Sequence, residues 1–326
     1  VMQQSIGTPL FWTSFLGIVL FLLAMDLGVF NRRAHAVSMK EALSWSIVWI
    51  LLSLSFGAWI YGNFGRQHGL EFFAGYLIEY ALSVDNIFVF ILIFSYFAVP
   101  ARLHHRVLFW GILSALVLRA LFIIAGAALI HSFHWIIYLF GAFLVFTGVK
   151  ILRQGETEVE PQRNPVVRIF QRLVPMTTGY ETGRFFLRRQ GGIVATPLAL
   201  VLVTVEATDV VFATDSIPAI FGITQDPFIV YTSNICAILG LRSMYFLLSA
   251  VVRRFAYLGT GLGLVLAFIG LKMLVSGFYP IPIGISLSVV AAILAGSIVL
   301  SLLFPRNKAG LQASTAPAAT PKTGRT

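Results

Sequence analysis

The chain has 326 residues, of which 58% are hydrophobic and only 11% are charged, and its mean hydropathy is +0.88. This composition excludes an ordinary soluble domain and indicates a polytopic membrane protein. A net charge of +10 would suggest nucleic-acid binding in a soluble chain, but in a membrane protein basic residues mark topology, so no nucleic-acid partner is expected. The single cysteine, Cys236, excludes an internal disulfide and a thiolate metal cluster.

Apolar runs follow one another along most of the chain. The first lacks a basic segment before it and a small-residue cleavage site after it, so it is predicted to be a retained span and not a signal peptide. We expect an all-α, polytopic transmembrane helix bundle of about nine spans in residues 1–304, followed by a disordered cytoplasmic tail in residues 305–326. The runs lie near residues 8–30, 42–61, 70–98, 107–130, 134–150, 193–216, 228–250, 257–276 and 283–304.

Basic residues between or beyond the apolar runs lie almost wholly on one side of the predicted membrane, because they occur in every second connection. Arg66 alone lies on the other side. The positive-inside rule then places the N-terminus outside and the C-terminus in the cytoplasm. The loop of about residues 153–192 is the one sizeable segment between spans and is predicted to be cytoplasmic. Within it, residues 165–175 have the pattern of a short amphipathic helix lying on the anionic inner leaflet.

Two apolar runs contain more than one acidic residue, and each such residue costs about 2.5 to 3.5 kcal/mol near the centre of a membrane helix. The third run carries Glu79, Ser83, Asp85 and Asn86, and the sixth carries the polar residues Glu206, Asp209, Asp215 and Ser216. The third run is also about 29 residues long, or roughly 43 Å as a helix, so it must tilt or break. Unwinding near Asp85 and Asn86 would let Glu79 and Asp85 reach one cavity.

Three motifs recur in the same order in the two halves of the chain. They are residues 79–87 with 209–217, 118–122 with 241–245, and 146–152 with 268–274. The offset is three spans, so the copies, at about 70–152 and 193–275, are predicted to form an inverted repeat with a midplane site at their interface. Arg119 and Arg242 occupy matching positions. We expect them to neutralise carboxylates or bind backbone carbonyls, with gating as the alternative role.

The acidic motifs predict a cation site. If the two acidic spans cross antiparallel, Glu79 lies at the depth of Asp215 and Asp85 at that of Asp209, with Glu206 one turn nearer the cytoplasm. The predicted metal-binding residues are Glu79, Asp85, Asn86, Glu206, Asp209 and Asp215, supported by Ser83, Ser216, Arg119 and Arg242. Oxygen ligands of this kind suit Mg²⁺, Ca²⁺ or Mn²⁺. The histidines lie at span edges or in loops and are not expected to bind metal, and no prosthetic group is predicted.

The motifs E-Y-A-L-S-V-D-N at residues 79–86 and E-A-T-D-V-V-F-A-T-D-S-I-P at residues 206–218 resemble those of the TerC/Alx family. The segments D-L-G-V-F-N-R-R-A-H near the start and D-P-F-I-V-Y-T-S-N-I-C after residue 225 resemble that family too. The resemblance covers about residues 10 to 280. It implies a bacterial inner-membrane protein of the lysine-exporter and cation-exporter superfamily, whose members are associated with manganese efflux and tellurium resistance. It also implies that Glu79, Asp85, Glu206, Asp209 and Asp215 are the family's acidic positions.

Three functional hypotheses remain open at this stage. The leading one is a transporter of divalent cations, with Mn²⁺ efflux as the specific activity and protons as a candidate coupling ion. The second is a non-transporting membrane scaffold or metal-delivery subunit of a resistance complex. The third, an intramembrane aspartyl protease, is disfavoured because the chain lacks the G-x-G-D signature and carries acidic motifs in both halves. No enzymatic activity is expected. The predicted partners are the metal cation, protons and the lipid bilayer.

Overall fold

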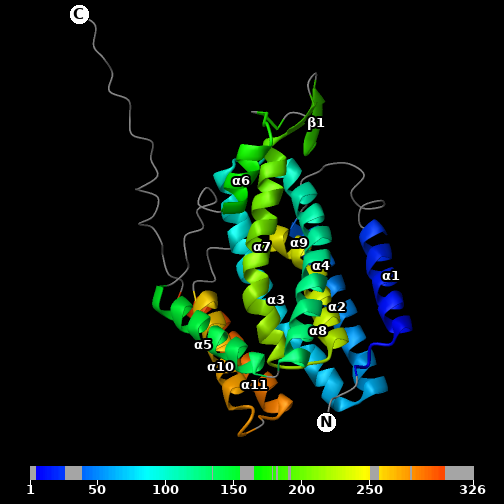
Figure 1. The fold of residues 1–326 in the computed structure, drawn as a ribbon, viewed down its shortest axis with the longest axis vertical. Helices are drawn as coiled ribbons and strands as arrows, with labels where there is room; N and C mark the ends of the chain where they lie inside the picture. The colour runs from blue at the N-terminus through cyan, green and yellow to red at the C-terminus, as the bar shows by residue number, and fades with distance from the viewer. Residues whose placement is uncertain are drawn as a thin grey trace, which may run out of the picture.

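The computed structural model describes residues 5–25, 39–133, 135–154, 165–177, 179–180, 183–189, 192–249, 257–279 and 281–304. The predicted tail, residues 305–326, lies outside this part of the chain, as does the side chain of Asp85. The described residues form a bundle of helices with one small β-hairpin at an end (Figure 1). This end is called the hairpin end below. The expected all-α membrane fold is confirmed.

The helices and strands follow the apolar runs closely. They are α1 (Pro9–Met25), α2 (Met39–Phe64), α3 (Arg66–Tyr96), α4 (Ala101–Ser132), α5 (Ile136–Gln154), α6 (Pro165–Leu173), β1 (Phe186–Arg189), β2 (Gly192–Ala195), α7 (Pro197–Phe221), α8 (Pro227–Leu239), α9 (Leu241–Ser249), α10 (Leu258–Val275) and α11 (Ile283–Leu303).

Seven of the described helices are long and apolar enough to cross a membrane, namely α2, α3, α4, α5, α7, α10 and α11. Two others, α1 and α8, are apolar but shorter. The seventh predicted run is divided at Gly240 into α8 and α9. Asp226 caps the start of α8, since its carboxylate accepts hydrogen bonds from Phe228 N at 2.9 Å and Ser5 Oγ at 2.6 Å.

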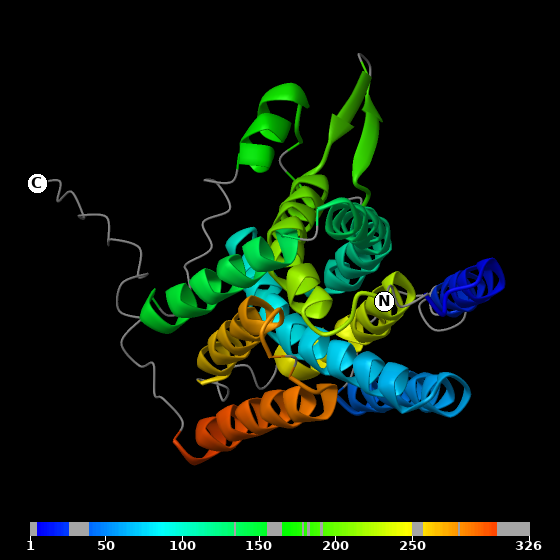
Figure 2. The same ribbon diagram turned by 60° about the horizontal axis from the view of Figure 1, so that its bottom comes forward.

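Helix α3 runs without a break through Asp85 and Asn86, so the predicted unwinding is wrong for this structure. A break inside a membrane would leave backbone groups without water partners, which is costly. With 31 residues, α3 is about 46 Å long against about 30 Å of hydrocarbon, so it must tilt or extend beyond the apolar layer. It crosses the middle of the bundle (Figure 2) and packs against α2, α7, α8 and α11.

The hairpin end contains α6, β1 and β2. Residues 193–195, predicted to begin the sixth span, instead form strand β2, which pairs antiparallel with β1. The reason lies at Pro197, which has no backbone N–H to donate and takes the first helical position of α7 after Thr196. Helix α6 confirms the amphipathic helix expected in the loop. Its Val167 is buried while Ile169 and Leu173 are exposed.

Helices α5 and α10 pack together at two pairs of glycines. A Cβ added at Gly270 would lie 2.5 Å from the carbonyl oxygen of Gly141, and one added at Gly148 would lie 2.5 Å from that of Gly263. In the predicted repeat, Gly148 corresponds to Gly270 and Gly141 to Gly263. When the two repeats are exchanged, each of the two glycine contacts is therefore converted into the other. Such an exchange is what a two-fold relation requires. It supports the inverted repeat, which stays a prediction.

The core consists of two hydrophobic clusters with a polar layer between them. The larger cluster includes Ala81 on α3 and Ala213 on α7, and the cluster nearer the hairpin includes Ile87 on α3 and Val205 on α7. Ser83, Asp85 and Asn86 on α3 and Glu206 and Asp209 on α7 fall between these residues, whereas Glu79 and Asp215 lie just beyond them, next to residues of the larger cluster. The apolar side chains thus pack on either side of a layer that contains most of the predicted cation-site residues.

Candidate functional site

Arg119 of α4 is the centre of the polar layer. Its side chain is 1% exposed and joins two carboxylates, donating to Glu79 Oε1 on α3 and to Asp209 Oδ1 on α7, the latter at 3.2 Å. It also donates to Ser216 Oγ at 3.3 Å. These four side chains are called the Arg119 cluster. They bring together both halves of the chain, as the prediction that Arg119 neutralises carboxylates requires.

The Arg119 cluster is not saturated. With Glu79 and Asp209 ionised, the guanidinium balances only one of two negative charges. The second oxygen of each carboxylate, Glu79 Oε2 and Asp209 Oδ2, is buried without a hydrogen-bond partner in the described part of the chain, as are Ser83 Oγ and Arg119 Nε. Buried polar groups without partners are costly. The site therefore offers acceptor oxygens for a further cation, a proton or water.

A cavity of about 20 Å³ lies beside Asp209, lined also by Glu206, Gly111 and Ile238. This volume holds about one water-sized occupant. Glu206 also lines a groove of about 590 Å³ between α4 and α7, together with Trp110 and the α6 residue Val166. The Glu206 carboxylate is thus placed between the groove at the surface of the bundle and the small cavity beside the Arg119 cluster.

The remaining predicted residues do not all converge on this centre. Asn86 is buried in the same layer, but Asp215 lies near Thr147 and Lys150 of α5. Arg242 is the second residue of α9, half-buried and with an interaction partner of its own. Among the described residues, no three His, Cys, Asp or Glu side chains are close enough together to hold a metal ion. One preformed centre of six ligands is therefore not found there.

The depth relation predicted for Glu79 agrees with the geometry, because Arg119 contacts both Glu79 and Ser216, the neighbour of Asp215. Asp85 was predicted to lie at the depth of Asp209, but its side chain lies outside the part of the chain that the structure describes. Because Arg119 also contacts Asp209, the predicted depth of Glu79 stays a prediction. The sequence order did not reveal that Asp215 turns towards α5 while Ser216 faces the cluster.

A family profile described as "Integral membrane protein TerC family" matches residues 64–309. The chain belongs to the TerC family. The match contains every predicted site residue from Glu79 to Arg242. This confirms the resemblance stated from the motifs alone.

Relatives in the TerC family extend over almost the whole chain. An uncharacterized membrane protein, STKORF319 of Myxococcus xanthus, is 52% identical over 303 residues, covering 93% of this chain and 95% of the relative. Proteins named "Putative membrane-bound redox modulator Alx" are 52% identical in Salmonella typhi and 50% identical in Escherichia coli K12, each covering 92% of this chain and 96% of the relative. No solved structure matched the chain.

Two polar groups of this TerC-family protein were missed in the sequence. Thr232, Ser233 and Asn234 on α8 are all fully buried, and neither amide atom of Asn234 has a hydrogen-bond partner in the described residues. The sequence feature that could have identified them is a run of three consecutive polar residues inside an apolar run. The other group is Glu71, whose oxygens accept hydrogen bonds from Gln67 Nε2 at 2.6 Å and Thr224 Oγ1 at 2.8 Å. Its signal was an acid two turns before Glu79 on the same helix.

Proposed function

We propose that this TerC-family protein transports a divalent metal cation across the membrane, with Mn²⁺ efflux as its specific activity. The observation that carries the proposal is the Arg119 cluster. Two carboxylates from separate acidic motifs, Glu79 and Asp209, converge on one buried cationic group. A site that holds a guanidinium between two carboxylates has the charge and the oxygen ligands that a hard divalent ion needs.

In this mechanism Arg119 and the transported ion compete for the same carboxylates. Arg119 neutralises one negative charge, whereas a divalent ion neutralises both. When the ion binds, Glu79 and Asp209 turn their oxygens to it, and Ser83 and Asn86 in the same layer add neutral oxygen ligands. Protons are the third cation that carboxylates accept, so exchange of the metal ion for protons is the proposed coupling.

The proposed location is the bacterial inner membrane, with the hairpin end in the cytoplasm. The basic residues between the spans support this orientation through the positive-inside rule. Helix α6 supports it as well, since Arg168 and Arg172 lie next to exposed apolar side chains, a combination suited to an anionic leaflet.

The Alx relatives are named as redox modulators. A redox role of this chain could act directly through a cysteine thiol. It would depend on Cys236, the one cysteine of the sequence, which is buried in α8. A single buried thiol cannot form an internal disulfide and is poorly placed to react. Metal transport is therefore the function that we favour, with a non-transporting scaffold or metal-delivery subunit as the alternative.

The test is Mn²⁺ flux into proteoliposomes that contain the intact chain, measured at two luminal pH values. We expect flux that depends on the pH gradient and that falls at least about tenfold in the double variant Glu79→Gln, Asp209→Asn. Glu41→Gln, which neutralises a carboxylate in the first turn of α2, is the matched control. Folded wild-type protein that moves no Mn²⁺ under any gradient would contradict transport and favour the scaffold alternative.

A further inference from the structure

A pocket of about 280 Å³ lies at the end of the bundle opposite the hairpin, where α5 begins and where α7 and α10 end. This pocket, called the Lys272 pocket, lies outside the Arg119 cluster. Pockets for drug-sized ligands measure about 300 to 1,000 Å³, so its occupant is smaller. None of its lining residues takes part in the transport mechanism described above.

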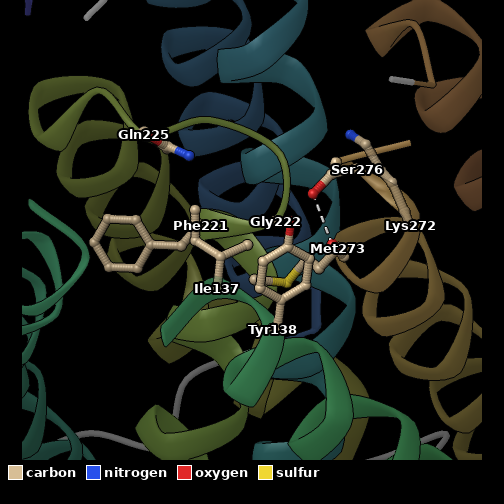
Figure 3. A pocket seen from close by; sticks show the side chains of 9 residues that line it. Ile137, Tyr138, Phe221, Gly222, Gln225, Lys272, Met273 and Ser276 are labelled. Carbon is tan, nitrogen blue, oxygen red and sulfur yellow. Dashed lines mark hydrogen bonds between the residues drawn. The ribbon is translucent and has the colours of Figure 1, made fainter. Parts of the chain in front are cut away.

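The lining divides into an apolar side and a polar side. Ile137, Phe221 and Met273 supply apolar surface, whereas Gln225, Lys272 and Ser276 supply polar groups. Figure 3 shows the polar ends of the last three side chains above the ring of Tyr138, while the Phe221 ring lies to one side. An apolar wall with a few polar groups on one side is the usual construction of a small-molecule site.

The charge of Lys272 decides the class of ligand. An ammonium at the end of a membrane helix is costly unless an anion or water compensates it. Glu71 is the acidic group that acts on Lys272, but its oxygens accept hydrogen bonds from Gln67 and Thr224 and form no direct ion pair with the ammonium. Within the described residues, no carboxylate oxygen lies within 4.0 Å of the Lys272 nitrogen as an ion pair. The ammonium therefore retains the capacity to bind an anion.

We propose that the Lys272 pocket binds a small anion that carries a phosphate group. Lys272 holds the charge, and the amide of Gln225 donates hydrogen bonds to phosphate oxygens, while the Ser276 hydroxyl donates to the Met273 carbonyl oxygen at 2.7 Å. The rest of the ligand lies against Phe221 and Met273. A free phosphate ester and the headgroup of an anionic phospholipid share this chemistry, and the pocket lies at the end of the spans, where either one has access.

The lysine at the matching position of the other repeat provides a control. Lys150 occupies the same place in its motif as Lys272, but it is exposed and lies near Asp215. It does not line the Lys272 pocket. Replacing either lysine by glutamine changes the net charge equally, so a difference between the two variants reports the pocket and not the overall charge.

The experiment measures binding and not flux, so its result is independent of the proposed transport. Glycerol 3-phosphate is titrated calorimetrically into delipidated protein in detergent. In a separate arm, protein from nanodiscs of phosphatidylglycerol or phosphatidylcholine is examined by native mass spectrometry for retained lipid. We expect Lys272→Gln to weaken binding at least about tenfold, as loss of a charged hydrogen bond predicts, and Lys150→Gln to leave it unchanged.

A second variant guards against misfolding. Gln225→Glu keeps Lys272 but adds a carboxylate to the lining of the same pocket, so it should abolish anion binding while leaving the melting temperature close to that of the wild type. If Lys272→Gln weakens the binding of glycerol 3-phosphate, the ligand is a free anion. If it lowers only the retention of phosphatidylglycerol, the ligand is the lipid headgroup. The proposal is overturned if wild-type protein binds neither probe, or if Lys272→Gln binds both as the wild type does.

Discussion

Arg119 and its two carboxylates form a buried charge cluster whose members depend on one another. Removing one partner of a buried ion pair leaves an uncompensated charge, at a cost of about 3 to 5 kcal/mol. Replacing the whole set by neutral residues of similar volume is often neutral or stabilising. Stability and function therefore respond differently to single and combined substitutions at this site.

We expect Arg119→Met alone to lower the free energy of unfolding by about 3 to 5 kcal/mol. The triple variant Arg119→Met, Glu79→Gln, Asp209→Asn should recover most of that loss while remaining inactive in Mn²⁺ flux. Thermal unfolding in detergent measures the stability of each variant. A triple variant as unstable as the single one would show that Arg119 acts mainly through packing and not through charge.

Helices α5 and α10 approach each other closely, backbone against backbone. The glycine pairs 141 with 270 and 148 with 263 leave no room for a Cβ between the two helices. Small residues at such interfaces let membrane helices pack by van der Waals contact, which replaces the hydrophobic driving force that lipid does not supply. Asp215 of α7 lies against this closely packed pair, near Thr147 and Lys150 of α5.

Gly148→Ala and Gly270→Ala should each destabilise the protein by about 1 to 3 kcal/mol, because the added methyl group meets backbone atoms of the facing helix. The effects should be similar if the two contacts are equivalent under the repeat. Gly296→Ala on α11 is the matched control. No atom lies within 4 Å of its added Cβ, so it should be neutral or stabilising by up to about 1 kcal/mol. Equal losses in all three variants would refute the close-packing account.

At the scale of the whole molecule, the orientation in the membrane follows from charge. The connections at the hairpin end carry the basic residues, and the opposite end carries few. The positive-inside rule therefore predicts that β1 and β2 face the cytoplasm and that the connection between α2 and α3 faces outward.

Cysteine labelling tests this orientation in a Cys236→Ala background. Arg188 on β1 and Asn63 near the end of α2 are both exposed. We expect a membrane-impermeant thiol reagent, added to intact cells, to label Asn63→Cys but not Arg188→Cys, and to label both after permeabilisation. The reverse pattern would mean that the orientation is inverted.

The sequence by itself determined the class of fold, because spans of apolar residues have few alternatives in a bilayer. It also determined the acidic motifs and the family, since unpaired carboxylates in apolar runs are too costly to be incidental. The same cost made carboxylate pairing one of the roles expected for Arg119, with binding of backbone carbonyls as the other. These conclusions depend on local composition and on spacing along the chain.

Only the tertiary structure decided which side chains meet. Asp215 and Ser216 are neighbours in the sequence, yet on a helix they point about 100° apart, so one faces α5 and the other the Arg119 cluster. Helix α3 stays unbroken, and it is Arg119 on α4 that reaches its Glu79 carboxylate. The Lys272 pocket likewise arises where the ends of three helices meet, a relation that no single stretch of the sequence contains.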